Sequence, residues 1–289
     1  MADSFRQYII TRFNIPIPTM LTRQLDEIDV TTNENYLDSR FELFEKYTVP
    51  SVLNQTNQDF KWLILFSDKT PEKYKDKMQV ISAGAGNCIP IYMNIAENMG
   101  DIIDDILHHA EAAYYLTTRL DNDDALALNF VSETQKIFKE KGPEEGVIIF
   151  ENGVQYEEKR NLSTFYHFKT NHFGTLVSRK EDRIKTILDF DHMHAAKMLS
   201  VRSINNAEPM WMEVIHESNV TNRMHFKYKD IVQNIDLNHY FASQIEAEGG
   251  MYSALQLRIM ALLNKPGNAF RLYKQYGLKK IIKKLQGRK

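Results

Sequence analysis

Three aspartates within four residues are the feature of this sequence that most clearly predicts chemistry. Asp121, Asp123 and Asp124 directly follow the apolar segment 114–120, which has the length of a buried strand. In an open α/β sheet, ligands bind outside the carboxyl ends of the strands, so the cluster lies where a ligand is expected. Carboxylates this close repel one another, and a divalent cation that also binds substrate phosphate removes the repulsion. The cluster therefore predicts a site for Mg²⁺ or Mn²⁺.

The same aspartates could serve a different purpose. Asp123 or Asp124 could cap the helix that follows, where an acidic side chain interacts favourably with the helix dipole. A calcium-binding EF-hand loop is excluded, because Leu126 stands where that loop needs glycine and Ser132 where it needs glutamate. Asp121 could instead be the nucleophile of an aspartyl phosphotransferase, although such a motif is expected after a first strand near the N-terminus.

The elements around the cluster predict an α/β domain with a mostly parallel, doubly wound sheet flanked by helices. Short apolar runs predict strands over 8–13, 60–66, 88–93, 114–120 and 146–151, with further strands and loops over 156–178. Apolar residues at helical spacing predict helices over 36–53, with a break at Pro50, and over 71–79, 100–113, 126–139 and 192–199. Residues 200–221 are expected to form loops, and helices are expected from about 240 to the end.

The overall composition indicates a soluble, folded protein. The chain has 289 residues, of which 43% are hydrophobic and 26% charged, enough for one large domain or two small ones. A single cysteine, Cys88, excludes a disulfide scaffold and indicates a reducing compartment, so a cytoplasmic location is expected. The longest apolar runs, 62–66 and 147–150, are too short to span a bilayer, and no signal peptide is expected.

Charge is distributed unevenly along the chain. Residues 268–289 carry a charge of +8 and no acidic residue, which leaves −10 on the remainder of a chain whose net charge is −2. Nucleic-acid binding by the acidic body is therefore not expected. Within 278–285, four apolar residues recur at helical spacing opposite four lysines, the pattern of an amphipathic helix at a membrane surface. Residues 266–289 are predicted to be a basic tail that binds an anionic membrane, or else to pack their apolar stripe on the body.

Two earlier segments and the aspartate cluster together resemble a known family. Residues 40–56, 59–66 and 119–126 are similar to the putative rhamnosyltransferase family of bacterial polysaccharide synthesis, and the resemblance covers residues 5–225. The resemblance implies a GT-A-like, Rossmann-like glycosyltransferase domain over residues 1–265. Such an enzyme moves a sugar, here rhamnose by the family's description, from a nucleoside-diphosphate sugar to a saccharide or lipid-linked glycan, with Mn²⁺ or Mg²⁺ as cofactor. The alternative is a non-catalytic module of the same fold that binds nucleotide sugars or glycans.

The resemblance also assigns roles to individual residues. Those expected to hold the donor nucleotide lie at the ends of the first strands and in the aspartate loop: Thr11, Arg12, Asp68, Arg119 and Asp121. Those expected to bind the metal are the three aspartates and one histidine from the C-terminal part of the domain: Asp121, Asp123, Asp124 and His216. A lone histidine such as His216 is as often an ordinary surface or core residue.

An inverting transfer also needs a carboxylate that takes the proton of the acceptor hydroxyl. The candidates are Asp189, Asp191 and Glu213. Asp191 is preferred, because it falls at the chain position where inverting enzymes of the resembled fold usually carry the base. The alternative is that Asp191 caps the helix expected over 195–199.

Overall fold

The computed structural model describes residues 4–16, 29–142, 144–190, 199–216, 224, 230–232, 235–245 and 252–263. Most of the helix expected over 192–199 and the whole tail over 266–289 lie outside these residues. The chain divides into two compact units. Unit 1 comprises residues 1–153, 167–212 and 237–245, and unit 2 comprises residues 154–166, 213–236 and 246–289. None of the described helices is long and apolar enough to cross a membrane.

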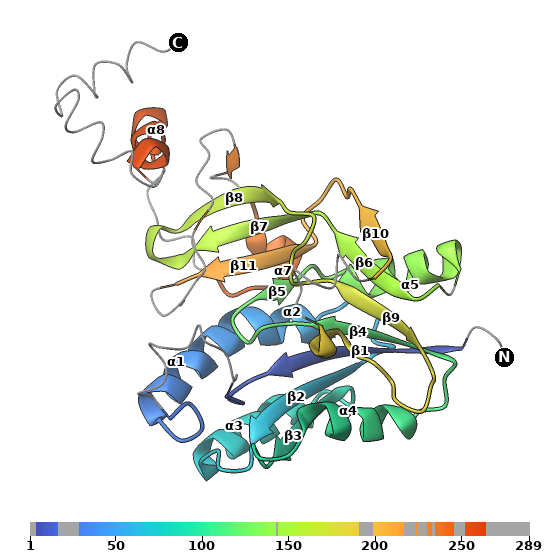
Figure 1. The fold of residues 1–289 in the computed structure, drawn as a ribbon. Helices are drawn as coiled ribbons and strands as arrows, with labels where there is room; N and C mark the ends of the chain where they lie inside the picture. Colours follow the sequence, from blue (N-terminus) through green and yellow to red (C-terminus); the bar gives the residue numbers. More distant parts are fainter. Residues whose placement is uncertain are drawn as a thin grey trace. The chain divides into compact units, whose positions relative to one another are not determined.

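A seven-stranded sheet forms the framework of unit 1, and Figure 1 labels its strands from β10 at one edge to β3 at the other. Its order is β10-β6-β9-β4-β1-β2-β3. The strands are β1 (Phe5–Arg12), β2 (Lys61–Ser67), β3 (Cys88–Met93), β4 (Tyr114–Arg119), β6 (Gly146–Phe150), β9 (Thr175–Arg179) and β10 (Val201–Ile204). All neighbours are parallel except β9, which runs antiparallel to both β4 and β6. The predicted α/β class with a mostly parallel sheet is confirmed.

The central strands are apolar almost without interruption because both of their faces are covered. In β2, every residue from Trp62 to Ser67 is buried. Such continuous burial is typical of the middle of a parallel sheet with helices on both sides. Ile9 of β1 pairs with Trp62, and Ile10 pairs with Leu63 on one side and Arg119 on the other. This register brings the carboxyl ends of β1, β2 and β4 to one edge of the sheet.

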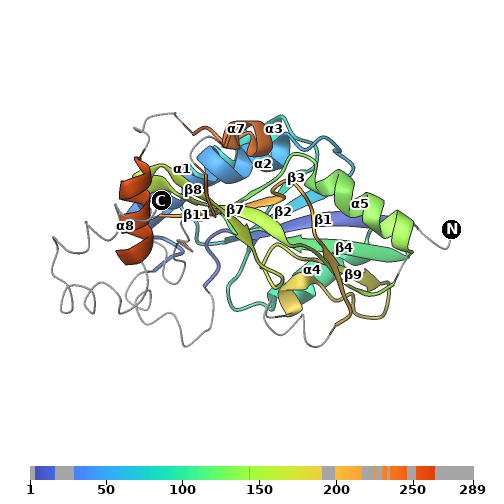
Figure 2. The same cartoon turned by 90° about the horizontal axis from the view of Figure 1, so that it is seen from above.

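Helices cover the two faces of this sheet. On one face, α4 (Met99–His108) packs Ile103 and Leu107 against Tyr8 and neighbouring residues. On the other face lie α1 (Glu34–Leu43), the π-helix η1 (Phe44–Thr48), α2 (Val49–Leu53) and α5 (Phe130–Lys141). The ring of Phe44 lies 5.4 Å from that of Trp62, measured between centroids. Figure 2 shows α2 and α4 on opposite sides of the strands.

The break expected at Pro50 takes the form of a change in helix type. The helix continues from α1 through η1 into α2, and Pro50 lies in the first turn of α2. Proline has no amide hydrogen to donate to the preceding turn, so a regular α-helix could not run through it. The wider turn of η1 separates the two α-helical segments at this point, and such turns are frequent beside functional sites.

Two expectations about secondary structure were wrong. Residues 200–221 are not all loops, because β10 pairs with β6, and β11 (Trp211–Ile215) is a buried strand. The helix expected from residue 126 begins at Phe130, because β5 (Ala125–Leu126) pairs antiparallel with β11. Both segments are too short to show a period, so their structure depends on a partner far away in the sequence.

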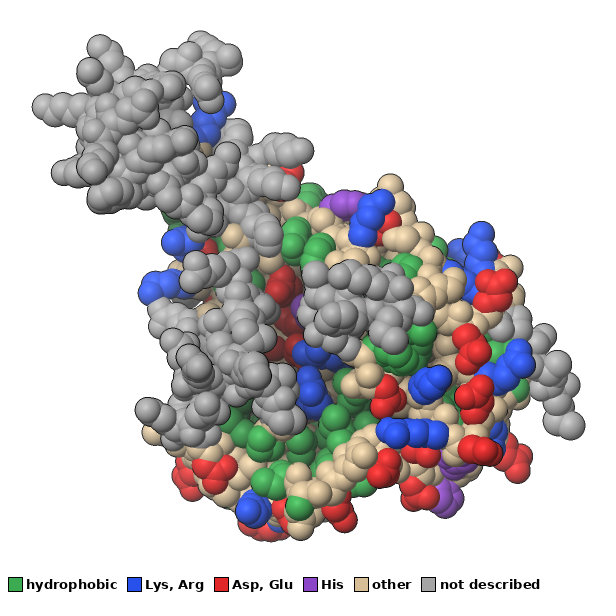
Figure 3. All heavy atoms as spheres, viewed as in Figure 1, with side chains coloured by type: hydrophobic (Ala, Val, Ile, Leu, Met, Phe, Trp, Pro, Cys, Tyr) green, Lys and Arg blue, Asp and Glu red, His purple; other side chains and the backbone are tan. Residues whose placement is uncertain are grey.

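Further helices and a second group of strands make up the remaining described elements. Those in unit 1 are α3 (Glu72–Ala83), η3 (Ile187–Asp189) and α7 (Leu237–Phe241). Those that lie wholly or mostly in unit 2 are β7 (Asn152–Glu157), η2 (Glu158–Arg160), β8 (Leu162–His167), β12 (Ile231–Val232) and α8 (Ala254–Leu263). The strands outside the seven-stranded sheet have the order β12-β8-β7-β11-β5. Unit 2 has a core of its own, made by Leu162, Ile215, Met224, Leu257 and Ala261. Figure 3 shows acidic and basic side chains interspersed over the described part of the face it draws.

Candidate functional site

The aspartates lie in a loop that follows β4 and is held from two sides. The side-chain amide of Asn122 donates a hydrogen bond to the carbonyl of Phe13, just after β1, at 2.9 Å. The hydroxyl of Thr48, in the π-helix η1, donates to the carbonyl of Asp124 at 2.8 Å. The loop backbone is therefore fixed both to the carboxyl edge of the sheet and to the helical segment that covers it.

Two of the three aspartates are paired with arginines. The guanidinium of Arg119 donates two hydrogen bonds to the carboxylate of Asp121, at 2.9 and 2.8 Å. Arg40, from α1, donates to the carboxylate of Asp123 at 2.7 Å, and the two side chains are only 14% and 12% exposed. Because these ion pairs fix the two carboxylates, the mutual repulsion expected from the sequence is already reduced in the protein.

The third aspartate is paired with a histidine that the sequence did not single out. The Nε2 atom of His172 lies 2.9 Å from a carboxylate oxygen of Asp124, and these side chains are 15% and 3% exposed. One ligand atom from each of Asp121, Asp124 and His172 lies within 4.8 Å of the other two. Two carboxylates and one imidazole at this separation could hold a divalent metal ion.

The topology explains how His172 reaches the aspartates. His172 lies just before β9, which runs antiparallel to β4, so the start of β9 meets the end of β4. Thr118 pairs with Thr175 in this register, and their hydroxyls lie 2.7 Å apart. No local motif in the sequence marks His172. Only the antiparallel pairing of β4 with β9 could have identified it, and the sequence predicted a mostly parallel sheet.

The aspartates differ in their protonation. Burial opposes ionisation of Asp121, but the charges of Arg119, His172 and Arg12 outweigh it and hold the pKa of Asp121 well below its usual range. At Asp124, burial raises the pKa, the hydrogen bond from His172 opposes the rise, and the neighbouring charge of Asp123 adds to it. Asp121 is thus a fixed negative charge, whereas Asp124 retains a proton more readily.

Arg12 is a cation at this site whose charge no described residue pairs. It ends β1 and is half-buried, and its side chain makes no hydrogen bond or ion pair with any residue that the structure describes. Burial lowers the pKa of Arg12, as does the charge of Arg119, whereas Asp121 raises it. A half-buried guanidinium beside carboxylates that already have partners suits an anionic ligand, and its planar fork matches phosphate oxygens.

The other two strand-end residues predicted to contact the donor differ from each other. Thr11 is fully buried, and its hydroxyl accepts a hydrogen bond from the indole of Trp62 at 3.0 Å. Its side chain thus serves the core of the sheet and has no surface for a ligand. Asp68 follows β2 with an exposed side chain, and its backbone amide donates to the carbonyl of Met93 at 2.8 Å.

The predicted proton acceptor and the predicted histidine ligand remain predictions. Asp191 lies outside the described residues. Asp189 caps η3, where it accepts hydrogen bonds from the backbone and side chain of Thr186, at 2.7 and 3.2 Å. Glu213 is buried in unit 2 and accepts a hydrogen bond from the side chain of Gln155 at 2.6 Å. His216 also belongs to unit 2.

Comparisons with known proteins agree with the resemblance found in the sequence. Residues 7–228 match the family described as "Putative rhamnosyl transferase". A search of curated proteins finds no match.

Solved structures with a similar chain include TarS from S. aureus. A crystal structure of its residues 1–349 is 8% identical, covers 72% of this chain and 60% of its own, and has a TM-score of 0.42. The same fragment in complex with UDP is 9% identical, covers 93% of this chain and 68% of its own, and has a TM-score of 0.41. A putative nucleotide-diphospho-sugar transferase from Desulfovibrio desulfuricans G20 is 6% identical, covers 73% and 81%, and has a TM-score of 0.31. This chain thus spans about three fifths of the first of these structures.

Proposed function

We propose that this chain, which belongs to the family of putative rhamnosyl transferases and is therefore a glycosyltransferase, transfers a sugar with the help of a divalent cation. In this proposal the donor is a nucleoside-diphosphate sugar, and rhamnose is the first candidate for the sugar. The acceptor is a saccharide or a lipid-linked glycan. The observation that carries the proposal is the group formed by Asp121, Asp124 and His172, whose ligand atoms lie within 4.8 Å of one another. Arg12 supplies a positive charge beside this group, and no described side chain pairs with it. A metal site next to such a guanidinium is suited to a diphosphate.

The donor set favours one metal over another. Mg²⁺ prefers an all-oxygen octahedron and keeps several waters, whereas Mn²⁺ accepts imidazole as well as carboxylate ligands. With His172 among the ligands, we propose Mn²⁺ as the better fit and Mg²⁺ as the alternative. Asp123, also predicted as a ligand, is held by Arg40 and acts in this proposal as a neighbouring charge.

The protein residues have distinct tasks in this reaction. Arg12 binds the diphosphate of the donor, and Arg119 holds the carboxylate of Asp121 in place by two hydrogen bonds. A bound cation supplies positive charge against the charge that grows on the leaving diphosphate. In an inverting transfer, Asp191 takes the proton from the acceptor hydroxyl as its oxygen bonds to the anomeric carbon and the bond from that carbon to the phosphate oxygen breaks.

A turnover assay tests the proposal. Wild-type protein is incubated with Mn²⁺, a saccharide acceptor and each of a panel of nucleoside-diphosphate sugars, and release of nucleoside diphosphate is measured. Asp121→Asn is expected to lower the rate by about 100-fold or more, because a fixed charge at the reacting centre is lost. Glu133→Gln, on the exposed side of α5, is the matched control and is expected to retain the rate.

Three outcomes would contradict the proposal in different ways. Full activity of Asp121→Asn would remove the aspartate loop from the reaction. Tight donor binding without turnover would favour the non-catalytic binding module. A phosphorylated Asp121 would identify a phosphotransferase. The anomeric configuration of the product, read by NMR, decides between inversion and retention.

We also propose that residues 266–289 hold the enzyme at the cytoplasmic face of an anionic membrane, where lipid-linked acceptors lie. The support is the pattern of lysines opposite apolar residues over 278–285. A chain truncated after Pro266 is expected to lose binding to vesicles of anionic lipid and to keep its melting temperature. Unchanged vesicle binding would contradict this part of the proposal.

A further inference from the structure

The histidine loop, residues 168–174 between β8 and β9, is held by the side chain of one buried asparagine. Asn171 is 4% exposed. Its side-chain nitrogen donates hydrogen bonds to the carbonyls of Phe150, at the end of β6, and of Phe168, both at 2.8 Å. Its side-chain oxygen accepts a hydrogen bond from the backbone amide of Phe173 at 3.1 Å. These contacts use both hydrogens of the side-chain amide, and they fix the backbone on both sides of the histidine.

An aromatic pair anchors the same loop at the same point. The ring of Phe173 is stacked on the indole of Trp211, with the centroids 4.9 Å apart and the two planes inclined by 13°. The indole nitrogen of Trp211 donates to the carbonyl of Phe150 at 2.9 Å, so this carbonyl accepts hydrogen bonds from both Asn171 and Trp211. Gly153 makes this packing possible, because a side-chain carbon there would collide with the indole. All of these residues belong to unit 1.

His172 is therefore confined between fixed neighbours. Its imidazole lies 4.1 Å from the ring of Phe173, measured between centroids, and its Nε2 atom lies 2.9 Å from a carboxylate oxygen of Asp124. Asp121 and Asp124 lie on a different loop, after β4, so the geometry of the three ligand atoms depends on how each loop is held. A loop supports a metal ligand less precisely than a helix or strand does, unless other contacts fix it. On the histidine side, the hydrogen bonds of Asn171 provide such contacts.

We propose that Asn171 is a positioning residue of the metal site. It acts through His172, because it holds the histidine loop so that the imidazole stays within reach of a cation bound by Asp121 and Asp124. A ligand that is already in place binds a metal ion more tightly, because less conformational freedom is lost on binding. The inference rests on the proposed function, since it requires a cation at these three residues. Asn171 does not itself bind the cation in this proposal.

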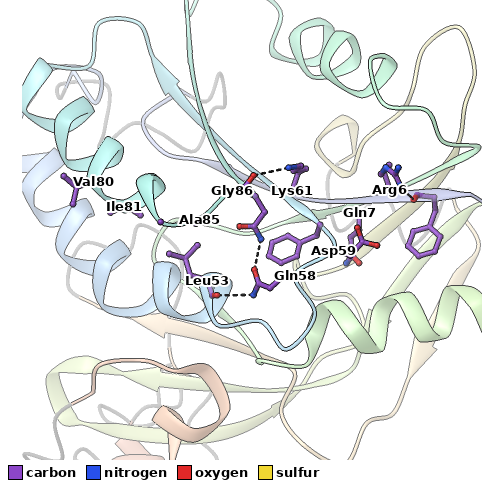
Figure 4. Close-up of a pocket in the computed structure, with 14 residues that line it drawn as sticks. Arg6, Gln7, Leu53, Gln58, Asp59, Lys61, Val80, Ile81, Ala85 and Gly86 are labelled. Atoms are coloured by element: carbon purple, nitrogen blue, oxygen red, sulfur yellow. Dashed lines mark hydrogen bonds between the residues drawn. The ribbon is translucent and has the colours of Figure 1, made fainter.

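Gln55 provides a matched control at the other edge of the sheet. It is 3% exposed, and its side-chain amide donates to two backbone carbonyls, at 2.8 and 2.7 Å, and accepts from one backbone amide at 3.0 Å. Asn171 makes contacts of the same number and kind. Gln55 lies between Leu53 and Gln58, and both of these line a pocket of about 690 Å³ at the amino ends of β1 and β2 (Figure 4). The aspartates lie at the carboxyl ends, so only one of the two amides is next to a metal ligand.

The test is a titration of the full chain with Mn²⁺, followed by electron paramagnetic resonance. Asn171→Ala and Gln55→Ala are both expected to lower the melting temperature, because each removes three hydrogen bonds of a buried amide. Only Asn171→Ala is expected to weaken Mn²⁺ binding, by about tenfold or more. With Co²⁺ at saturation, the visible absorption spectrum of Asn171→Ala is expected to differ from that of the wild type, whereas the spectrum of Gln55→Ala is expected to match it.

A double-mutant cycle tests whether Asn171 acts through the histidine. In a His172→Asn background, Asn171→Ala is expected to change the Mn²⁺ affinity by less than about twofold, because the ligand that Asn171 positions is already gone. If Asn171→Ala does not fold, Asn171→Ser replaces it in every measurement. The serine hydroxyl can still accept from the amide of Phe173, whereas the two amide hydrogens that reach the neighbouring carbonyls are absent.

Three results would overturn this inference alone. They are an Asn171→Ala variant that binds Mn²⁺ as tightly as the wild type, an equal loss of affinity in Gln55→Ala, and a loss from Asn171→Ala that is the same with and without His172. Two other results would overturn the proposed metal site together with the inference. They are a wild-type protein that binds no Mn²⁺ at about 1 mM, and a His172→Asn variant that binds it as the wild type does.

Discussion

At the scale of single residues, the aspartates that look equivalent in the sequence have different partners in the protein. Asp121 pairs with Arg119, Asp123 with Arg40, and Asp124 with His172. Among the described residues, Asp121, Asp124 and His172 bring two carboxylate oxygens and an imidazole nitrogen within 4.8 Å of one another. Nearness to His172, more than the spacing in the sequence, distinguishes Asp121 and Asp124 from Asp123.

The first prediction separates Asp124 from Asp123. Asp124→Asn is expected to weaken Mn²⁺ binding by about 100-fold, because a charged ligand becomes neutral, whereas Asp123→Asn weakens it only about tenfold through a lost neighbouring charge. Titration of Mn²⁺ followed by electron paramagnetic resonance gives both affinities. Equal losses in the two variants would mean that Asp123 leaves Arg40 to bind the metal.

The second prediction concerns Arg12. Because it has no described ion-pair partner, Arg12→Met is expected to leave the melting temperature unchanged or higher, since a half-buried charge is removed. The same variant is expected to weaken the binding of nucleoside diphosphate by about tenfold or more. Thermal unfolding and calorimetry measure the two effects. A large loss of stability with unchanged nucleotide affinity would show that Arg12 serves the fold.

The sequence could predict the aspartate loop but not the complete residue set. Three carboxylates after an apolar strand are a local pattern, so Asp121 and Asp124 can be identified from the sequence alone. His172 lies 48 residues beyond Asp124 and reaches it only through the antiparallel pairing of β9 with β4. Thr11 lies at a strand end as predicted, but its side chain is buried in the core, and its contact with the donor stays a prediction.

At the scale of secondary-structure elements, the helical segment α1–η1–α2 has a double task. Phe41 and Phe44 are fully buried in the core of unit 1. From the same segment, Arg40 reaches the carboxylate of Asp123, and Thr48 reaches the carbonyl of Asp124. The π-turn lets one continuous helical segment present residues both to the core and to the loop.

The third prediction tests this task of η1. Thr48→Val removes the hydroxyl that donates to Asp124 and leaves a buried carbonyl short of a partner, which is expected to cost about 1–3 kcal/mol of unfolding free energy. Thr134→Val is the matched control, because Thr134 is equally buried but its hydroxyl has no hydrogen-bond partner within the described part of the chain. Urea unfolding measures both variants. An equal loss in the control would mean that the hydrogen bond to the loop contributes nothing specific.

The fourth prediction concerns the thiol of Cys88 at the start of β3. Burial raises its pKa to about 12, and the residue is 7% exposed. The reactive thiolate is therefore scarce at pH 8, and although each further pH unit raises its fraction about tenfold, the labelling rate at pH 9 is expected to stay far below that of an exposed cysteine. A thiol-reactive disulfide should label the native protein very slowly and the denatured protein at once. Rapid labelling of the native protein would show that β3 opens to solvent.

Strands that consist of a continuous apolar run were the ones that the sequence could predict best. β3 has the bounds expected for it, 88–93, and the starts and ends of β2 and β4 differ from the expectation by one residue at most. β5, β10 and β11 were missed or misjudged, because two to five residues show no reliable period and gain their strand structure from pairing.

At the scale of the whole molecule, the described parts of unit 1 carry two features at opposite edges of one sheet. The aspartate loop lies at the carboxyl ends of the parallel strands, where ligand-binding loops are expected in an open α/β sheet. A pocket whose lining includes Arg6, Leu53 and Lys61 lies at their amino ends. The length of the strands therefore separates this pocket from the aspartate loop.

The measurement that tests the central claim most directly is a thermal-shift titration with nucleoside diphosphates and their sugars, with and without Mn²⁺. Wild type is compared with Asp124→Asn, with His172→Asn and with the control Glu133→Gln. We predict that one nucleotide at about 100 times its dissociation constant raises the melting temperature of wild type and control by roughly 5–10 °C, only with Mn²⁺, and that both site variants lose this shift. A shift that needs no metal, or one that His172→Asn retains in full, would contradict a metal-assisted donor site at Asp121, Asp124 and His172.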